Sequence, residues 1–317
     1  LLKQFNTKDL LNTPLPAPES LSFLQASSII QCVRYSLVLL NRETDPSTFM
    51  EEKSLRYYVL ERGYSVALYG LTQERQLPLQ VYVGYTLFRN GMPMAYGGAW
   101  VFGGHALFGL NIFEAYRGGE SGYILCQLLR TYIQAFSLNE IEIDSYQFGN
   151  NNPEGIESGA YWFYYKYGFR SMDFRLRQLA SKEVQKMQQR KGYRSTAATL
   201  TQLAAVNMRM QIRKTRMVPY ERLHRKLAME WREQKWMVHQ RIPSRIAQDH
   251  WLKDDSDRML WNQGVFDEVN LIQLRFQLTK KEELRVLNEM ARCKASNPYS
   301  YNALLSQLLN WLDHEAI

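Results

Sequence analysis

The stretch VYVGYTLFRNGMPMAYGGAWVFGGHALFGLNIF, residues 81–113, is rich in Val, Tyr, Phe and Trp, which favour β-strands. Strands are expected at Val81–Phe88, Pro93–Val101 and Ala106–Phe113. The Asn90-Gly91 pair between the first two is typical of a tight hairpin. Gly103-Gly104 separates the last two. With a further strand expected at Ser65–Tyr69, the pattern predicts an antiparallel meander.

Helical patterns flank this meander on both sides. A helix is expected over Thr48–Arg62, because Asp45-Pro46-Ser47 end the preceding element and acidic residues follow in the first turn. Residues 124–136 repeat apolar side chains every three or four positions, which predicts an amphipathic helix. Strand, helix and strand are then expected at Ile141–Ile143, Glu157–Tyr167 and Phe169–Leu176. The sequence therefore predicts an α+β fold.

Composition divides the 317 residues into three segments. We expect a helical or extended lead at 1–47, an α+β domain at 48–178 and a basic α-helical module at 179–317. Residues 1–178 carry 15 Lys and Arg against 16 Asp and Glu, whereas residues 179–317 carry 24 against 15. The net charge of +8 is therefore C-terminal. Helices are expected there at Ser181–Arg190, Thr196–Met217, Pro219–Met237, Leu271–Lys294 and Ser300–Leu312.

The C-terminal charge is concentrated in Lys182–Arg245, with 16 basic and 4 acidic residues. Such an excess can attract a polyanion at cellular salt, so RNA or tRNA is one expected partner. A solvated helical face is the other interpretation.

Composition also excludes several classes of protein. With 45% hydrophobic and 22% charged residues the chain can bury a sizeable core, which argues against disorder. Cys32, Cys126 and Cys293 lack metal-ligand spacing, so we expect neither a disulfide framework nor a metal site. No apolar run approaches the roughly 18 residues of a membrane span, and residues 1–14 lack a signal-peptide pattern. We expect a cytoplasmic protein without a membrane partner.

The segment Arg117-Gly118-Gly119-Glu120-Ser121-Gly122 joins an expected strand to an expected helix. A glycine-rich turn in this position presents backbone N–H groups at the positive end of the helix dipole, and can bind an anion. An ordinary turn is the alternative. No Gly-Lys-Ser/Thr follows and the preceding strands form a meander, so neither a Walker loop nor a dinucleotide site is expected.

Two segments resemble the GNAT superfamily of acyl-CoA-dependent N-acyltransferases. The glycine-rich loop is similar to the family's phosphate loop, Arg/Gln-x-x-Gly-x-Gly/Ala, except that Glu120 replaces one glycine. The family pattern Ala-x-x-x-Tyr-x-Lys-x-Gly-Phe is matched by Ala160, Tyr164, Lys166, Gly168 and Phe169. The order of elements from Thr48 to Leu176 also resembles the GNAT core. This resemblance implies a mixed, mostly antiparallel sheet flanked by helices.

The resemblance also implies acetyl-CoA or another acyl-CoA as co-substrate. Its binding residues would be Leu110, Ile112 and Phe113 of the strand and Arg117, Gly118, Gly119, Ser121, Gly122 and Tyr123 of the loop and helix. A backbone N–H within Leu110–Phe113 would bind the developing oxyanion. Tyr164, whose phenol ordinarily has a pKa of about 10, would protonate the leaving thiolate. The alternative is that Tyr164 is one more aromatic residue of the core.

Glu114, Glu142 and Asp144 are candidate bases for the amine, or plain surface carboxylates. Glu120 places a negative charge where a pyrophosphate would lie, at a cost on the order of 1 kcal/mol or more within about 5 Å. Either its side chain points away or the loop binds something less anionic. The expected function is an N-acyltransferase acting on a small-molecule or peptide amine. The alternatives are an aminoacyl-tRNA-dependent transferase and a non-catalytic binding protein that uses the basic module.

Overall fold

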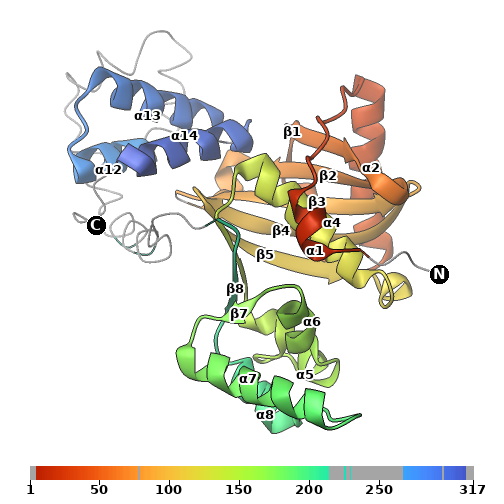
Figure 1. Ribbon diagram of the computed structural model, residues 1–317. Helices are drawn as coiled ribbons and strands as arrows, with labels where there is room; N and C mark the ends of the chain where they lie inside the picture. Colours follow the sequence, from red (N-terminus) through yellow and green to blue (C-terminus); the bar gives the residue numbers. More distant parts are fainter. Residues whose placement is uncertain are drawn as a thin grey trace.

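The computed structural model describes residues 5–77, 79–213, 225, 229, 267–294 and 296–311. Its eight strands form one open sheet in the order β1-β2-β3-β4-β5-β6-β8-β7 (Figure 1). They are β1 Met50–Val59, β2 Tyr64–Leu71, β3 Val81–Arg89, β4 Met92–Phe102, β5 His105–Ile112, β6 Glu140–Ile143, β7 Arg170–Ser171 and β8 Met208–Gln211. Only β5 and β6 pair in parallel among these strands. The predicted α+β class, with a mixed, mostly antiparallel sheet flanked by helices, is confirmed.

The predicted meander is confirmed as β2 to β5. Asn90 and Gly91 join β3 to β4 and have φ values of 49° and 81°, the left-handed conformation that a tight hairpin turn requires. Arg89 pairs with Met92 directly beside this turn. Residues alternate between the two faces of the sheet, as strand geometry demands. Val66 and Leu68 therefore pack in one core cluster and Ala67 in another.

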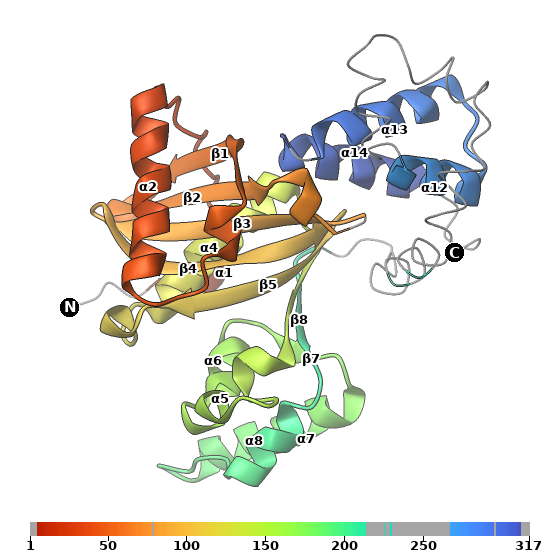
Figure 2. The ribbon, with the colours of Figure 1, turned by 180° about the vertical axis from the view of Figure 1, so that it is seen from behind.

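Helices cover both faces of the sheet (Figures 1 and 2). Helix α4 (Ser121–Phe136) packs on one face, and α1 (Thr7–Asn12) lies on its outer side. Helix α2 (Phe23–Leu39) packs on the other face through Ile30, Val33 and Leu37. The remaining helical segments before β8 are α3 Asp45–Thr48, α5 Pro153–Glu157, α6 Ala160–Lys166, α7 Phe174–Gln189, α8 Ala197–Leu203 and the short 3₁₀ turns η1 Glu61–Gly63, η2 Gln73–Arg75, η3 Glu114–Tyr116 and η4 Ser145–Phe148.

The helix expected over Thr48–Arg62 is wrong. The Asp45-Pro46 signal begins only the four-residue α3, and β1 follows at Met50. Pairing with β2 buries Met50 and Tyr58 in the core. This tertiary pairing outweighs the helix-like charge pattern of the segment.

The elements expected after Phe169 are also corrected. The strand expected at Phe169–Leu176 is only β7, because the Asp173 carboxylate accepts a hydrogen bond from Leu176 N–H and starts α7. The helix expected at Thr196–Met217 ends at Leu203, and β8 then enters the sheet between β6 and β7. The expected boundary after Gln178 therefore falls inside α7 and does not separate the sheet from the C-terminal segment.

The C-terminal helices pack beside the sheet. They are α12 Asp267–Phe276, α13 Lys281–Cys293 and α14 Pro298–Trp311, so the helix expected at Leu271–Lys294 is two helices. The break includes Gln277, whose φ is 51°. Asn302 of α14 donates a hydrogen bond to the Gly103 carbonyl at 2.9 Å. The helix expected at Pro219–Met237 lies outside the described residues. No described helix is long and apolar enough to cross a membrane.

Candidate functional site

Strands β5 and β6 pair over only half of β5. The parallel pairing joins His105–Phe108 to Glu140–Ile143, and among the described strands none pairs with β5 on this side beyond Phe108. The backbone N–H of Leu110 donates instead to Oε1 of Gln147 at 3.2 Å. The strands therefore diverge at their carboxyl ends, which is where open sheets commonly bind ligands.

Gln147 brings together two groups that the sequence had placed in this site. The Tyr164 hydroxyl on α6 donates to the same Gln147 Oε1 at 3.3 Å. Leu110 N–H and Tyr164 O–H therefore converge on one carboxamide oxygen. Gln147 itself, in the turn after β6, was missed by the sequence analysis, because a glutamine in a polar loop has no distinguishing pattern.

Tyr164 is both a core aromatic and a hydrogen-bond donor in the site. Its side chain is 3% exposed, and its ring contacts Phe148, Phe163 and Phe169 at centroid distances of 6.1, 5.3 and 5.8 Å. Burial raises its pKa well above the usual value of about 10. The phenol is therefore protonated at neutral pH and can donate.

The glycine-rich loop forms the entry to α4. Gly118 N–H donates to Ser121 Oγ at 3.0 Å, and Ser121 N–H donates back to the Gly118 carbonyl at 2.9 Å. Among the described residues, no protein acceptor lies at the N–H groups of Gly119, Glu120, Gly122 and Tyr123. Free amides at a helix start, together with the helix dipole, attract an anion.

Arg117 and Glu120 point in different directions from the loop. Arg117 Nη1 lies 2.5 Å from Glu154 Oε1, and its Nε donates to the Ile112 carbonyl. The Glu120 carboxylate is paired with Arg89 and accepts a hydrogen bond from the Tyr64 hydroxyl at 2.7 Å. Its side chain therefore reaches toward the ends of β2 and β3, and its negative charge is compensated there.

Gly122 has a packing role. A Cβ atom at this position would lie 1.6 Å from the Tyr167 hydroxyl oxygen. Only glycine therefore lets the end of α6 approach the first turn of α4 so closely.

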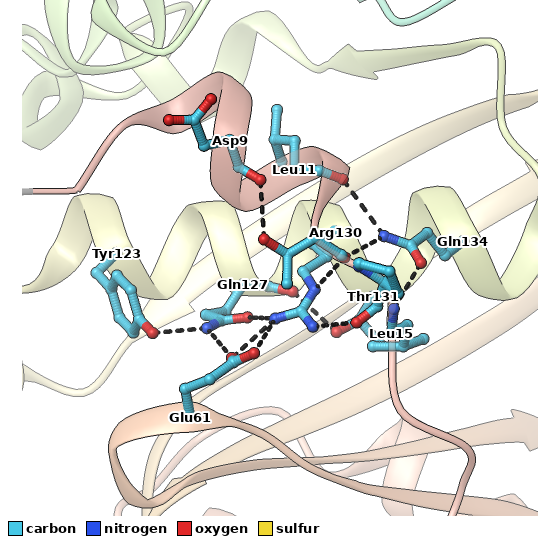
Figure 3. Close-up of polar contacts among 11 residues, drawn as sticks. Asp9, Leu11, Leu15, Glu61, Tyr123, Gln127, Arg130, Thr131 and Gln134 are labelled. Carbon is cyan, nitrogen blue, oxygen red and sulfur yellow. Dashed lines mark hydrogen bonds and ion pairs between the residues drawn. The ribbon is translucent and has the colours of Figure 1, made fainter.

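The N-terminal segment holds α4 in place (Figure 3). Arg130 Nε and Gln134 Nε2 both donate to the Thr13 carbonyl at 2.8 Å. Arg130 also forms an ion pair with Glu61 at 2.8 Å, and Leu15 N–H donates to Gln134. These contacts fix α4, and with it the glycine-rich loop, relative to the sheet.

The candidate bases lie apart from the Leu110–Tyr164 pair. Glu114 is exposed and forms an ion pair with Arg42 at 3.3 Å. Asp144 is exposed and accepts a hydrogen bond from Tyr146 N–H. None of the three carboxylates bonds to Gln147 or Tyr164 in the described part of the chain.

Glu142, the third candidate base, is buried in a polar network. Its carboxylate lies 3.1 Å from His105 Nε2 and accepts from Asn207 Nδ2 at 2.6 Å. Burial raises the pKa of Glu142, but hydrogen bonds from His105 and Asn207 lower it by more, so the net pKa is lowered. Glu142 is therefore an ionised structural carboxylate that joins β6 to its neighbours.

No group of three or more His, Cys, Asp or Glu among the described residues could hold a metal ion. Comparisons with protein-family models, with curated proteins and with solved structures find no match for this chain. Its function is therefore inferred from the geometry of the site.

Proposed function

We propose that this chain is an N-acyltransferase that moves an acyl group, expected to be acetyl, from an acyl-CoA thioester to an amine. The observation that carries the proposal is the convergence of Leu110 N–H and Tyr164 O–H on the Gln147 amide oxygen. Two donors aimed at one carbonyl-type oxygen are what acyl transfer needs, because negative charge develops on that oxygen. A protonated phenol beside it can also supply the proton that a leaving thiolate takes up.

The residues around the glycine-rich loop fit a phosphorylated carrier. Gly119, Glu120, Gly122 and Tyr123 offer backbone N–H groups without a protein acceptor in the described part of the chain. Arg89 compensates the charge of Glu120, which removes the main electrostatic objection to a pyrophosphate. Bound acyl-CoA would supply the activated thioester.

The edge of β5 beyond Phe108, which pairs with no described strand and is bonded only by side chains, supports the same proposal. Leu110 and Ile112 direct their backbone groups to the side that β6 has left, since alternate residues of a strand face the same neighbour. The amide-containing arm of an acyl-CoA can form backbone-like hydrogen bonds with such an edge. Glu114 and Asp144 stay the candidate bases for the amine, both accessible to water.

Acetyl-CoA is expected to raise the melting temperature of the full chain, because a ligand at a hundredfold excess over its Kd stabilises the folded state by about 2.7 kcal/mol. Differential scanning fluorimetry measures the shift. Ser121→Asp is the matched variant, since an Asp carboxylate can still accept from Gly118 N–H while repelling phosphates. The Ser121→Asp protein should fold normally, but acetyl-CoA should raise its melting temperature much less. Absence of any shift with acetyl-CoA, longer acyl-CoA or free coenzyme A at millimolar concentration contradicts the proposal.

Gly109→Ala is expected to fold normally but to lower kcat/KM by about tenfold or more, equivalent to about 1.4 kcal/mol. Its Cβ would meet only Gly98 O at 3.7 Å and Gln147 Nε2 at 3.9 Å, so the methyl group fits but occupies space beside the two donors. Gly98→Ala is the control for packing, because its Cβ would lie 2.3 Å from the Tyr82 hydroxyl and should reduce stability. Full activity in Gly109→Ala would place the reaction elsewhere.

The two alternative functions that use the basic C-terminal module, an aminoacyl-tRNA-dependent transferase and a non-catalytic binding protein, stay predictions. Half of Lys182–Arg245 lies beyond Arg213, where the structure describes only Arg225 and Met229. The compensated charge of Glu120 also removes the reason for preferring a less anionic ligand than coenzyme A.

A further inference from the structure

A cavity of about 660 Å³ lies on the face of the sheet opposite α4. Its floor is made by Tyr82 of β3 and Trp100 of β4, whose ring centroids are 5.1 Å apart. Both side chains point away from the α4 side, because their neighbours Val81, Val83 and Val101 belong to the core cluster beneath α4. The segment from Arg42 to Phe49, between α2 and β1, forms the opposite wall.

The cavity wall presents both signs of charge side by side. Arg42 forms an ion pair with Glu114 through Nη2, but its Nε is buried and has no hydrogen-bond partner among the described residues. That atom is not accessible from the cavity, but the Arg42 side chain is 33% exposed, and its terminal guanidinium N–H groups can bind an anionic ligand group. Glu43, the next residue, is in the cavity wall and forms no ion pair with another described residue.

Arg42 and Glu43 in the cavity wall also lie near Tyr96 of β4. Burial raises the pKa of Tyr96, and the charges of Arg42 and Glu43 act on it in opposite directions, so both lie close to this phenol. Tyr96 pairs with Asn111 of β5, the residue directly after Leu110. Arg75, whose Cζ lies 3.7 Å from the centroid of the Phe49 ring, also lines the cavity.

Trp100, which lines the cavity, lies on the same face of the sheet as Gly109 of β5. Trp100 pairs with Leu107, and Gly98 with Gly109 two residues further on. Gly109 has no side chain on that face, and a Cβ at this position would lie 3.9 Å from Gln147 Nε2. A ligand held at Arg42 and Glu43 therefore lies on the same face of the sheet as Gly109, the residue directly before Leu110.

We propose that this cavity binds the amine acceptor, and that the acceptor is a free α-amino acid with an aromatic or large aliphatic side chain. Its carboxylate pairs with Arg42, its amino group lies by Glu43, and its side chain packs on Tyr82 and Trp100. This inference rests on the proposed function. In the reaction, the amine nitrogen loses a proton and bonds to the thioester carbonyl carbon, the carbon–sulfur bond breaks, and the sulfur leaves as a thiol after taking a proton.

The test uses isothermal titration of the full chain with four probes and no acyl donor. L-phenylalanine carries all three groups, phenethylamine lacks the carboxylate, 3-phenylpropionate lacks the amine, and glycine lacks the side chain. L-phenylalanine is expected to bind, and each of the other three to bind on the order of tenfold more weakly or worse. Equal binding of phenethylamine and L-phenylalanine overturns the assignment of the carboxylate to Arg42.

Three variants assign each contact. Arg42→Gln should weaken the binding of L-phenylalanine by on the order of tenfold and leave the binding of phenethylamine unchanged. Glu43→Gln should weaken the binding of both probes. Glu52→Gln, a carboxylate outside the cavity that pairs with Arg34, is the matched control and should bind every probe like the unmodified protein.

The two proposals can fail separately. If acetyl-CoA raises the melting temperature but neither L-phenylalanine nor L-leucine binds, the amino-acid acceptor is overturned and the acyltransferase proposal is not. If L-phenylalanine binds with the expected variant pattern but no acyl-CoA binds, the cavity is an amino-acid site and the acyltransferase proposal fails.

Discussion

Tyr164→Phe is expected to lower kcat by about two orders of magnitude or more, because a positioned general acid contributes about 10²- to 10⁴-fold. The phenylalanine ring keeps the contacts with Phe148, Phe163 and Phe169. Only the hydrogen bond to Gln147 is lost, at a cost to stability of about 0.5–1.5 kcal/mol. Release of free thiol from acetyl-CoA, followed at saturating amine, measures the rate.

Tyr161→Phe is the matched control for this prediction. Tyr161 lies on the same helix and also contacts Phe148, but its buried hydroxyl has no hydrogen-bond partner in the part of the chain that the structure describes. Its removal should therefore leave the rate unchanged and the stability equal or higher. Equal rates for Tyr164→Phe and the unmodified protein would exclude Tyr164 from the reaction.

Arg130→Met is expected to lower the free energy of unfolding by about 3 kcal/mol, because several charge-assisted hydrogen bonds are lost together. Arg130 is 1% exposed and donates to the Thr13 carbonyl, to Glu61 and to Gln127. Methionine fills similar space but cannot donate, so the N-terminal segment loses its main attachment to α4. Urea unfolding of the full chain, followed by circular dichroism, measures the change.

Glu61→Gln separates the ion pair from the rest of this network. The Glu61 side chain is 49% exposed, so replacing its charge should cost about 1 kcal/mol or less. A comparable loss in both variants would show that Arg130 acts only through Glu61, and would contradict the attachment of the N-terminal segment through backbone carbonyls.

The meander could be predicted because its signals are local. The Asn90-Gly91 turn and the β-branched and aromatic runs on either side lie within a few residues of one another. β1 and β8 could not, because each becomes a strand only by pairing with a partner outside its own segment. In β8, the four residues from Met208 to Gln211 include no β-branched residue, so nothing local indicates a strand.

The candidate site likewise combines residues that local patterns indicate with residues that only the folded chain brings together. Leu110 and Tyr164 were identified through a family resemblance, and both lie at one oxygen. The compensation of Glu120 depends on Arg89 and Tyr64, which are 31 and 56 residues away, so no local pattern reveals it. Arg42 and Glu43 were not recognised either, because the cavity exists only once the segment after α2 folds over β3 and β4.

The position of β8 bears on how this chain can be divided experimentally. β8 lies between β6 and β7 in the sheet. Within the described residues it forms the backbone hydrogen bonds along one edge of each of these two strands. Truncation after Gln178 would remove β8 and leave the N–H and C=O groups on that edge of β6 unpaired. Unpaired strand edges promote aggregation between copies of a protein. A fragment meant to retain the sheet must extend through Arg213, and the basic region can be studied apart only beyond that residue.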